Sequence, residues 1–522
     1  MHRKHSFLIL VTCYLLLGFS AATAAKKPNI LFAIADDWSF PHAGVYGCTW
    51  VETPHFDRVA REGVLFTRAY TPVAKCSASR ASILTGRNPW VNESGFTHWN
   101  YFPHQFASFA EVLGQHGYFT GYTGKGWIPG VAETHDGKKR NLLGRAYQKH
   151  NLTPPTSQIR KTDYAANFGD FLDDAGDTPW FFWFGSSEPH RAYEFQTGAK
   201  IGGKKLSDLP AVPAYWPDNA DVRHDMLDYA LEVEYFDHTL GKFLAELESR
   251  GELENTLIVV TSDNGMPFPR AKGQCYEIAN HMPLAVLWPG GTNQPGREVT
   301  DFVSFVDFAP SFLDAAGVDY SSSGMSAPSG RSLLPLLASP RSGQIDSDRD
   351  FVLIGRERHD PGRPHNAGYP VRGIVKDDFM YLHNFAPDRW PAGNPETGYL
   401  DVDRSPTKDA LLAARSAKGS DAHWSLNFGR RDAEELYHVV DDPANVTNLA
   451  QSPVHQTRVQ EMREQLMAQL LAEGDKRLTS GDPDYFDKFR FSNDAFNDLY
   501  ERWQAGKLDL PHWGDPDPAA AD

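Results

Sequence analysis

Short, almost continuously apolar runs alternate with longer segments of helical periodicity between residues 29 and 316, and this alternation limits the possible fold more than any other feature. Strands that alternate with helices predict a mostly parallel sheet covered by helices on both faces. Strands buried on both faces are apolar at nearly every position, as these runs are. The expected strands are 29–35, 64–70, 118–122, 180–185, 256–261, 284–288 and 302–306, and the expected helices include 55–62, 106–116, 223–249 and 308–316.

The chain has 522 residues, more than one ordinary core holds, which predicts a large domain and a smaller one. Near residue 340 the composition changes to segments rich in Ser, Pro and Gly. Expected strands at 369–375 and 379–385 and a helix at 454–471 follow, and they indicate an antiparallel sheet. We therefore expect an α/β domain over 26–345 that carries the chemistry, a smaller α+β domain over 346–478, and a surface-wrapping tail over 479–522.

The N-terminal segment 1–25 has the pattern of a secretory signal peptide: a basic start, an apolar run over 7–19 and small residues at 20–25. That run is too short to span a membrane comfortably, and no later uninterrupted apolar run reaches about 18 residues. We expect an exported protein without a membrane span, periplasmic or secreted, or lysosomal or extracellular if the host is a eukaryote. The net charge of −16 argues against a broad nucleic-acid surface but allows a local basic pocket.

Four of the expected strands end next to residues with ionisable or metal-binding side chains. Because ligands bind outside the carboxyl ends of the strands in an open α/β sheet, these groups are expected to converge on one cleft. They are Asp36 and Asp37 after 29–35, Lys125 after 118–122, His190 after 180–185, and Asp263 and Asn264 after 256–261.

Asp36, Asp37 and Asp263 carry carboxylates and Asn264 carries an amide. These four side chains together offer only hard oxygen ligands. Such a set favours Ca²⁺ or Mg²⁺ over zinc. Adjacent aspartates, and the sequence Ser-Asp-Asn-Gly at 262–265, are ordinarily solvated turns. Their shared position after buried strands favours a metal site.

Cys76 begins the segment Cys-Ser-Ala-Ser-Arg, at a point where an expected strand gives way to a helical run that Gly86 can close. A side chain at a helix N-terminus meets free backbone N–H groups and the positive end of the helix dipole, and Arg80 lies one turn further on. This arrangement can hold an oxyanion. A partly buried free cysteine is the alternative interpretation.

The segment at 76–80 resembles the C-x-[PA]-x-R signature of type I sulfatases, and further motifs match that family in order: 27–31, 36–37, 121–125, 189–190, 262–265 and 435–450. The resemblance implies an alkaline-phosphatase-like fold. It also implies that a formylglycine-generating enzyme, a partner in maturation, oxidises Cys76 to formylglycine. By the same resemblance, Ca²⁺ is bound by Asp36, Asp37, Asp263 and Asn264 together with the modified Cys76, and the sulfate is surrounded by Arg80, Lys125, His190 and Lys272.

In such a site the cation and the basic groups stabilise charge that develops on the sulfate oxygens, and His190 or Lys272 protonates the leaving group. After one hydroxyl of a hydrated aldehyde has attacked sulfur, the second hydroxyl lets the aldehyde re-form and expel the covalently bound sulfate, which a serine cannot do. The chain departs from the family at Trp127, where a histidine often stands two residues after the lysine. We expect Lys125, or a histidine from elsewhere such as His98 or His135, to take over its role.

Within the family, residues 262–269 resemble the heparan N-sulfatase branch and its bacterial relatives, because Pro-Phe-Pro after Asn-Gly is not general. Segments 189–191 and 381–385 indicate the same branch. The resemblance implies a sulfated saccharide substrate, with the sulfate on nitrogen or on oxygen. Candidate saccharide contacts are His98, Trp99, Arg191 and Tyr193, and loop packing is their alternative role.

Two other functions stay open at this point. One is a phosphodiester or phosphonate hydrolase of the same superfamily, since such a site can process both kinds of anion. The other is a non-catalytic glycan-binding protein, against which the complete set of expected ligands argues. A disulfide between Cys48 and Cys275 is possible, but the odd number of cysteines beyond the signal segment implies no disulfide framework.

Overall fold

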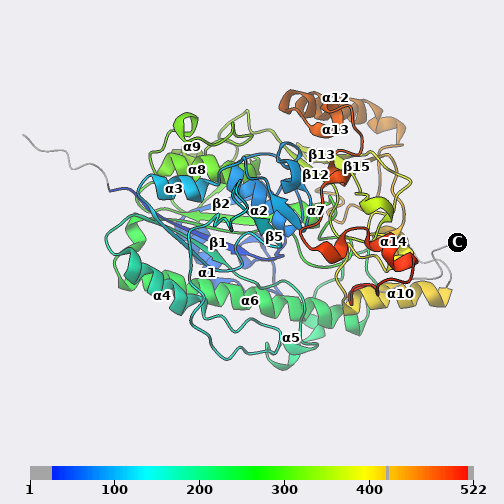
Figure 1. Cartoon of the computed structure of the whole chain (residues 1–522). Helices are drawn as coiled ribbons and strands as arrows, with labels where there is room; N and C mark the ends of the chain where they lie inside the picture. The colour runs from blue at the N-terminus through cyan, green and yellow to red at the C-terminus, as the bar shows by residue number, and fades with distance from the viewer. Residues whose placement is uncertain (1–25, 419–421, 515–522) are drawn as a thin grey trace, which may run out of the picture.

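The computed structural model describes residues 26–418 and 422–514, so the expected signal segment 1–25 lies outside the described residues. A nine-stranded sheet forms the centre of the molecule, in the order β10-β2-β9-β8-β1-β7-β4-β6, with β11 paired to β2 (Figure 1). The strands are β1 (Asn29–Ala35), β2 (Val64–Tyr70), β4 (Phe119–Gly124), β6 (Arg145–Ala146), β7 (Trp180–Gly185), β8 (Thr256–Ser262), β9 (His281–Leu287), β10 (Arg297–Val299) and β11 (Val303–Ser304).

All strand pairs of this sheet are parallel except those of β9, which runs antiparallel to both β8 and β2. This confirms the expected mostly parallel sheet with helices on both faces. Helices α1 (Pro54–Glu62), α4 (Tyr164–Ala175) and α6 (Ala220–Ser249) cover one face. The opposite face is covered by α2 (Cys76–Thr85), α3 (Phe109–Gln115), α8 (Phe308–Ala315) and α9 (Leu334–Ala338).

The central strand β1 shows why its sequence is apolar at every position. Leu31 and Ala33 point to the core beneath α6, whereas Ile30 and Phe32 point to the core beneath α8. A strand with period two therefore needs apolar residues on both of its faces here. The result is two separate cores that hold β1 rigidly from both sides.

Several expected elements have limits that differ by a few residues, and in two of them local capping explains the difference. The expected strand 302–306 pairs only over β11, and a 3-10 helix (Phe305–Asp307) follows, since the Asp307 carboxylate accepts a hydrogen bond from the Ser304 N–H at 3.2 Å. The expected helix 106–116 begins later, at Phe109. Ser108 caps it, accepting from the Glu111 N–H at 3.1 Å, while the Glu111 side chain accepts from the Ser108 N–H.

A second sheet lies beside the first and is antiparallel throughout, in the order β12-β13-β14-β15. Its strands are β12 (Phe351–Arg356), β13 (Val371–Lys376), β14 (Phe379–Asn384) and β15 (Glu434–His438). Helix α12 (Gln456–Glu473) packs on it through Val459, Met462, Leu466 and Leu470. This confirms the expected smaller α+β portion with an antiparallel sheet.

Residues 479–514 form short helical turns that pack back on the body through Phe491, Phe496 and Leu499. The ring of Phe496 lies edge-on to that of Trp99 at 5.0 Å, which brings this segment near the end of the central sheet. Across residues 26–418 and 422–514, no helix combines the length and apolar character needed to cross a membrane. Cys48 and Cys275 are both free thiols, so the possible disulfide between them is absent from the structure.

We predict that Arg372→Met lowers the free energy of unfolding by about 3–5 kcal/mol, measured by urea denaturation. Arg372 is fully buried in β13 and binds Asp475 at 2.7 Å and Glu357 at 2.8 Å, so its loss leaves buried carboxylates under-compensated. Arg490→Ala is the matched control, because its pair with Asp494 is exposed and is expected to contribute less than about 1 kcal/mol. Equal effects of the two substitutions would contradict this account.

Candidate active site

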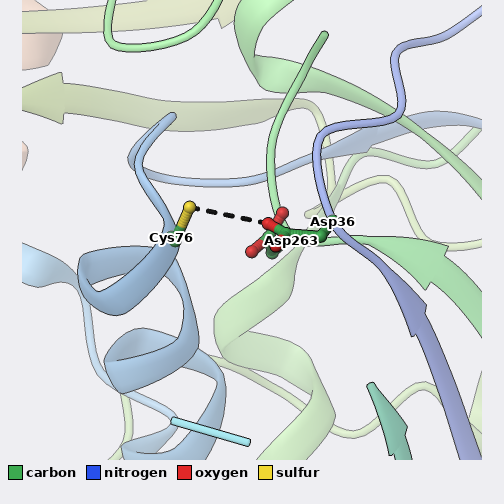
Figure 2. A group of neighbouring side chains, drawn as sticks. All are labelled: Asp36, Cys76 and Asp263. Atoms are coloured by element: carbon green, nitrogen blue, oxygen red, sulfur yellow. Dashed lines mark hydrogen bonds between the residues drawn. The ribbon is translucent and has the colours of Figure 1, made fainter. Parts of the chain in front are cut away.

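Two parallel neighbours, β1 and β8, bring four of the expected ligands together. Ala35 pairs with Ser262, so the residues that follow each strand emerge side by side at the same edge of the sheet. Helix α2 begins opposite them with Cys76. One carboxylate oxygen each of Asp36 and Asp263 and the Cys76 Sγ atom all lie within 4.8 Å of one another, and all three residues are buried (Figure 2).

Asp37 and Asn264 complete this cluster. Asp37 adopts a left-handed backbone conformation (φ 78°), and its N–H donates to Asp263 Oδ1 at 3.1 Å. The Asn264 amide donates to Asp37 Oδ1 at 2.6 Å. Asn264 Oδ1 is buried and has no hydrogen-bond partner among the described residues, which leaves it as a free acceptor. A cation that prefers oxygen ligands fits this donor set, and it would satisfy that orphaned oxygen.

Three cationic side chains form ion pairs with the three aspartates. Each aspartate has a different nearest partner: Lys125 Nζ lies 2.5 Å from Asp36 Oδ2, Lys272 Nζ lies 2.7 Å from Asp37 Oδ2, and Arg80 Nε lies 2.8 Å from Asp263 Oδ2. Arg80 Nη2 also lies 3.9 Å from Asp36 Oδ1. All six side chains are buried.

The protonation states follow from these pairs. Burial alone would lower the pKa of Lys125, but the charge of Asp36 outweighs it, and the pKa lies above its usual value. For Lys272, the charges of Asp37 and then Asp403 likewise outweigh burial and hold the pKa well above the usual value. Both ammonium groups are therefore charged at neutral pH and can bind an anion.

Cys76 is the first residue of α2, and the whole helix is buried. Gly86 closes it in a left-handed conformation (φ 66°), as expected, with its N–H donating to the Ser82 carbonyl. Cys76 Sγ lies 3.5 Å from Asp36 Oδ1. Burial raises the pKa of the thiol to about 12, against the opposing charges of Lys125 and Lys272. An unmodified Cys76 is thus a neutral thiol and a poor nucleophile.

The cluster lies at a pocket with a volume of about 410 Å³. Both Cys76 and Asp36 line it, together with the two lysines. His190 lines it as well: its Nε2 lies 3.9 Å from Asp37 Oδ2, and its Nδ1 lies 2.6 Å from the Arg191 carbonyl.

The expected saccharide contacts divide into three groups. His98 and Trp99 line the pocket, and both bind Asp360, at 2.9 and 3.0 Å. Arg191 lines the pocket too, but Asp225 holds its guanidinium through two hydrogen bonds. Tyr193 is not among the lining residues, and its hydroxyl donates to the Pro189 carbonyl.

Of the groups considered as replacements for the family histidine, His135 is wrongly placed. It is exposed, its ring lies tilted beside that of His104 at a centroid distance of 5.1 Å, and it does not line the pocket. Trp127, which stands at that position, donates its indole N–H to the Ser77 carbonyl at 3.0 Å and packs on Phe102. Lys125 and His98 do line the pocket.

Several pocket residues were not expected from the sequence. Lys75 binds Asp360 at 2.5 Å, and Asp403 lies 3.4 Å from Lys272. The aspartates come from connecting segments with no motif of their own, whereas Lys75 could have been noticed as the neighbour of Cys76. The other unexpected lining residues are Ile128, Pro129, Gln158, Arg160, Ser187, Glu188, Ala192, Glu232 and Trp513.

We predict that Cys76, in protein that keeps it as a thiol, reacts with iodoacetamide at pH 8 at least about 100-fold more slowly than a free peptide thiol. With a pKa of about 12 the reactive thiolate is scarce at pH 8, and its fraction grows only as the pH approaches that value. Mass spectrometry of the alkylated peptide measures the rate. A rate equal to that of the free peptide would show that the neighbouring lysines, and not burial, control the thiol.

Comparison with known proteins places this geometry in a family. The family model described as Sulfatase matches residues 28–318, which is more than half of the chain. Human N-sulphoglucosamine sulphohydrolase is 29% identical over 490 residues, which cover 87% of this chain and 92% of that protein.

Solved structures share the fold. One is a complex with its substrate D-glucosamine-2-N,6-O-disulfate, with a TM-score of 0.61 and 20% identity, covering 88% of this chain and all of that chain. Another is the phosphonate monoester hydrolase of Agrobacterium radiobacter, with a TM-score of 0.58 and 18% identity, covering 87% and 97%. The sheet, the smaller antiparallel sheet and the family match agree, and the chain belongs to the sulfatase family of sulfuric ester hydrolases.

Proposed function

We propose that this enzyme removes sulfate groups from a sulfated carbohydrate, through a formylglycine made from Cys76 and with Ca²⁺ bound beside it. The observation that carries the proposal is the buried cluster of Asp36, Cys76 and Asp263, whose ligand atoms lie within 4.8 Å of one another at a pocket that Lys125 and Lys272 also line. A sulfate ester is an anion, and this pocket joins ammonium groups to a cation-binding set of oxygens.

The proposed metal ligands are Asp36, Asp37, Asp263 and Asn264, with the modified residue 76. Bound there, Ca²⁺ would stabilise the negative charge on the sulfate oxygens. The three carboxylates carry three negative charges, which Arg80, Lys125 and Lys272 balance before any ligand enters. A divalent cation adds a net positive charge, and this favours an anionic substrate.

The modified residue 76 would supply a hydrated aldehyde whose one hydroxyl attacks sulfur and whose other hydroxyl allows the sulfate to be expelled. The chain positions this group at the N-terminus of α2, where free backbone N–H groups favour negative charge. The carboxylate of Asp36, 3.5 Å from Cys76 Sγ, is placed to accept a proton from residue 76.

The remaining side chains bind the anion and move protons. Lys125 and Lys272 lie on the pocket wall and would each turn one N–H from an aspartate to a sulfate oxygen. Arg80 lies deeper, with its Nη1 on the carbonyls of residues 125 and 126, and it positions Asp263 and the Lys125 loop. His190 is partly exposed in the pocket and is the proposed donor of a proton to the leaving group.

We propose an N-sulfated glucosamine as the substrate class. The support comes from the names of two similar proteins, the human N-sulphoglucosamine sulphohydrolase and the structure bound to D-glucosamine-2-N,6-O-disulfate. An O-sulfated sugar is the second candidate, because that bound ligand carries both kinds of sulfate. We also propose that the protein is exported, on the basis of the signal pattern at 1–25.

We predict sulfate release from N-sulfated glucosamine by protein co-expressed with a formylglycine-generating enzyme, measured by ion chromatography. Cys76→Ala should abolish release, and Cys76→Ser should stop after at most one turnover, because a serine cannot re-form an aldehyde. O-sulfated sugars and a phosphonate monoester serve as comparison substrates. Release from O-sulfated sugars alone would discard the N-sulfate, and faster phosphonate hydrolysis would discard the sulfatase proposal.

We predict that Ca²⁺ raises the melting temperature of the protein, because the ion binds the folded state only. Asp263→Asn should remove most of this shift, measured by differential scanning fluorimetry with and without Ca²⁺. Asp403→Asn is the control, since Asp403 lines the same pocket but lies outside the proposed ligand set. An equal shift in all three proteins would place the ion elsewhere.

A further inference from the structure

Glu232 is a carboxyl group in the pocket wall that the proposed chemistry does not use. It lies on α6, with 2% of its surface exposed, and it lines the pocket together with Glu188 and Arg160. No described residue lies within hydrogen-bond or ion-pair distance of its side chain, over 26–418 and 422–514. A buried carboxyl group without a partner costs free energy, so its position requires an explanation.

Three of the ionisable groups around Glu232 have partners of their own, and the guanidinium of Arg160 is a further charge near it. Glu188 accepts hydrogen bonds from the Ser186 hydroxyl at 2.6 Å, the Tyr164 hydroxyl at 3.0 Å and the Arg160 N–H at 2.9 Å. Asp228, one turn earlier on α6, accepts from the N–H groups of residues 196 and 198. The Arg191 guanidinium is held by Asp225. Glu232 alone among these described neighbours faces the pocket with both oxygens free.

The form of the carboxyl group limits what it can bind. Burial, and then the charge of Glu188, hold the pKa of Glu232 well above its usual value, which favours the neutral form of the group. A neutral carboxyl offers one O–H donor and acceptor oxygens. A sugar hydroxyl also donates once and accepts, so the two groups can satisfy each other. The sulfate itself, as an anion, is expected to bind the ammonium groups of Lys125 and Lys272 in the same pocket.

We propose that Glu232 is a specificity-determining residue that hydrogen-bonds a hydroxyl group of the saccharide whose sulfate lies at residue 76. The inference rests on the proposed function for the position of the sulfate, and on the unpartnered side chain for the contact. It assigns the side of the pocket at Glu232 to the sugar ring and the side at Lys125 and Lys272 to the sulfate. Both sides belong to the same pocket, so one monosaccharide can reach both.

The test measures binding without turnover, in the Cys76→Ala background, by titration calorimetry with N-sulfoglucosamine and 6-O-sulfated glucosamine. Glu232→Leu should raise the dissociation constant for the sugar about 10- to 100-fold, the range expected when a buried hydrogen bond to a hydroxyl is lost. Glu232→Gln keeps a neutral donor and acceptor and should lose less than about 3-fold. Glu234→Leu is the matched control: it lies on the same helix, binds Lys204 and is outside the pocket.

The melting temperature distinguishes a binding role from a purely structural one. If Glu232 serves binding, removal of this buried, unpartnered carboxyl in Glu232→Leu should leave the melting temperature unchanged or higher. A lower melting temperature with unchanged sugar affinity would overturn the proposal. So would equal losses for the Gln and Leu variants, or failure of the background protein to bind either sugar. Binding that depends on Glu232, without sulfate release by the mature enzyme, would keep this inference and reject the proposed function.

Discussion

The mutual neutralisation of three aspartates and three basic side chains at the carboxyl edge of the central sheet is the interaction on which the site depends. Each of these six groups is buried, and a single buried charge without its partner costs several kcal/mol. The pairs therefore fix one another: Asp36 with Lys125, Asp37 with Lys272, and Asp263 with Arg80. The two apolar cores on either side of β1 supply the free energy that such a polar centre does not.

This balance also explains how an acidic protein can act on an anion. The net charge of the chain is −16, yet its pocket presents two protonated lysines and an oxygen cluster suited to a divalent cation. The long-range field does not attract the substrate, so the local groups must do so. Burial matters here because charges in a desolvated site interact more strongly than charges in water.

The part of the site that the sequence predicts is the part carried by strand ends and helix starts. Asp36, Asp263 and Cys76 each follow or begin a regular element, so the topology of a parallel sheet places them together. The pocket residues that come from connecting segments could not be predicted in this way. Asp360, Asp403 and Trp513 come from connecting segments far along the chain from Lys75 and Lys272, and only tertiary packing brings them to the same pocket.

The fold shows the same division. Strands β1, β2 and β7 have the bounds expected from apolar runs, because a strand buried on both faces has an unmistakable composition. The start of α3 and the end of β11 depend instead on backbone N–H groups that donate to the carboxylates of Glu111 and Asp307, which an apolar pattern does not reveal. The sequence offers Tyr193 as a candidate saccharide contact, with loop packing as its alternative role, and in the structure its hydroxyl donates to the Pro189 carbonyl.

The most direct test of the central claim is a crystal structure of the Cys76→Ala protein grown with Ca²⁺ and an N-sulfated glucosamine. The account predicts one calcium ion bound by Asp36, Asp37, Asp263 and Asn264, with a sulfate oxygen on the ion and the ammonium groups of Lys125 and Lys272 on the other sulfate oxygens. A sulfate group bound away from these residues, or calcium absent from the carboxylates at saturating concentration, would contradict it.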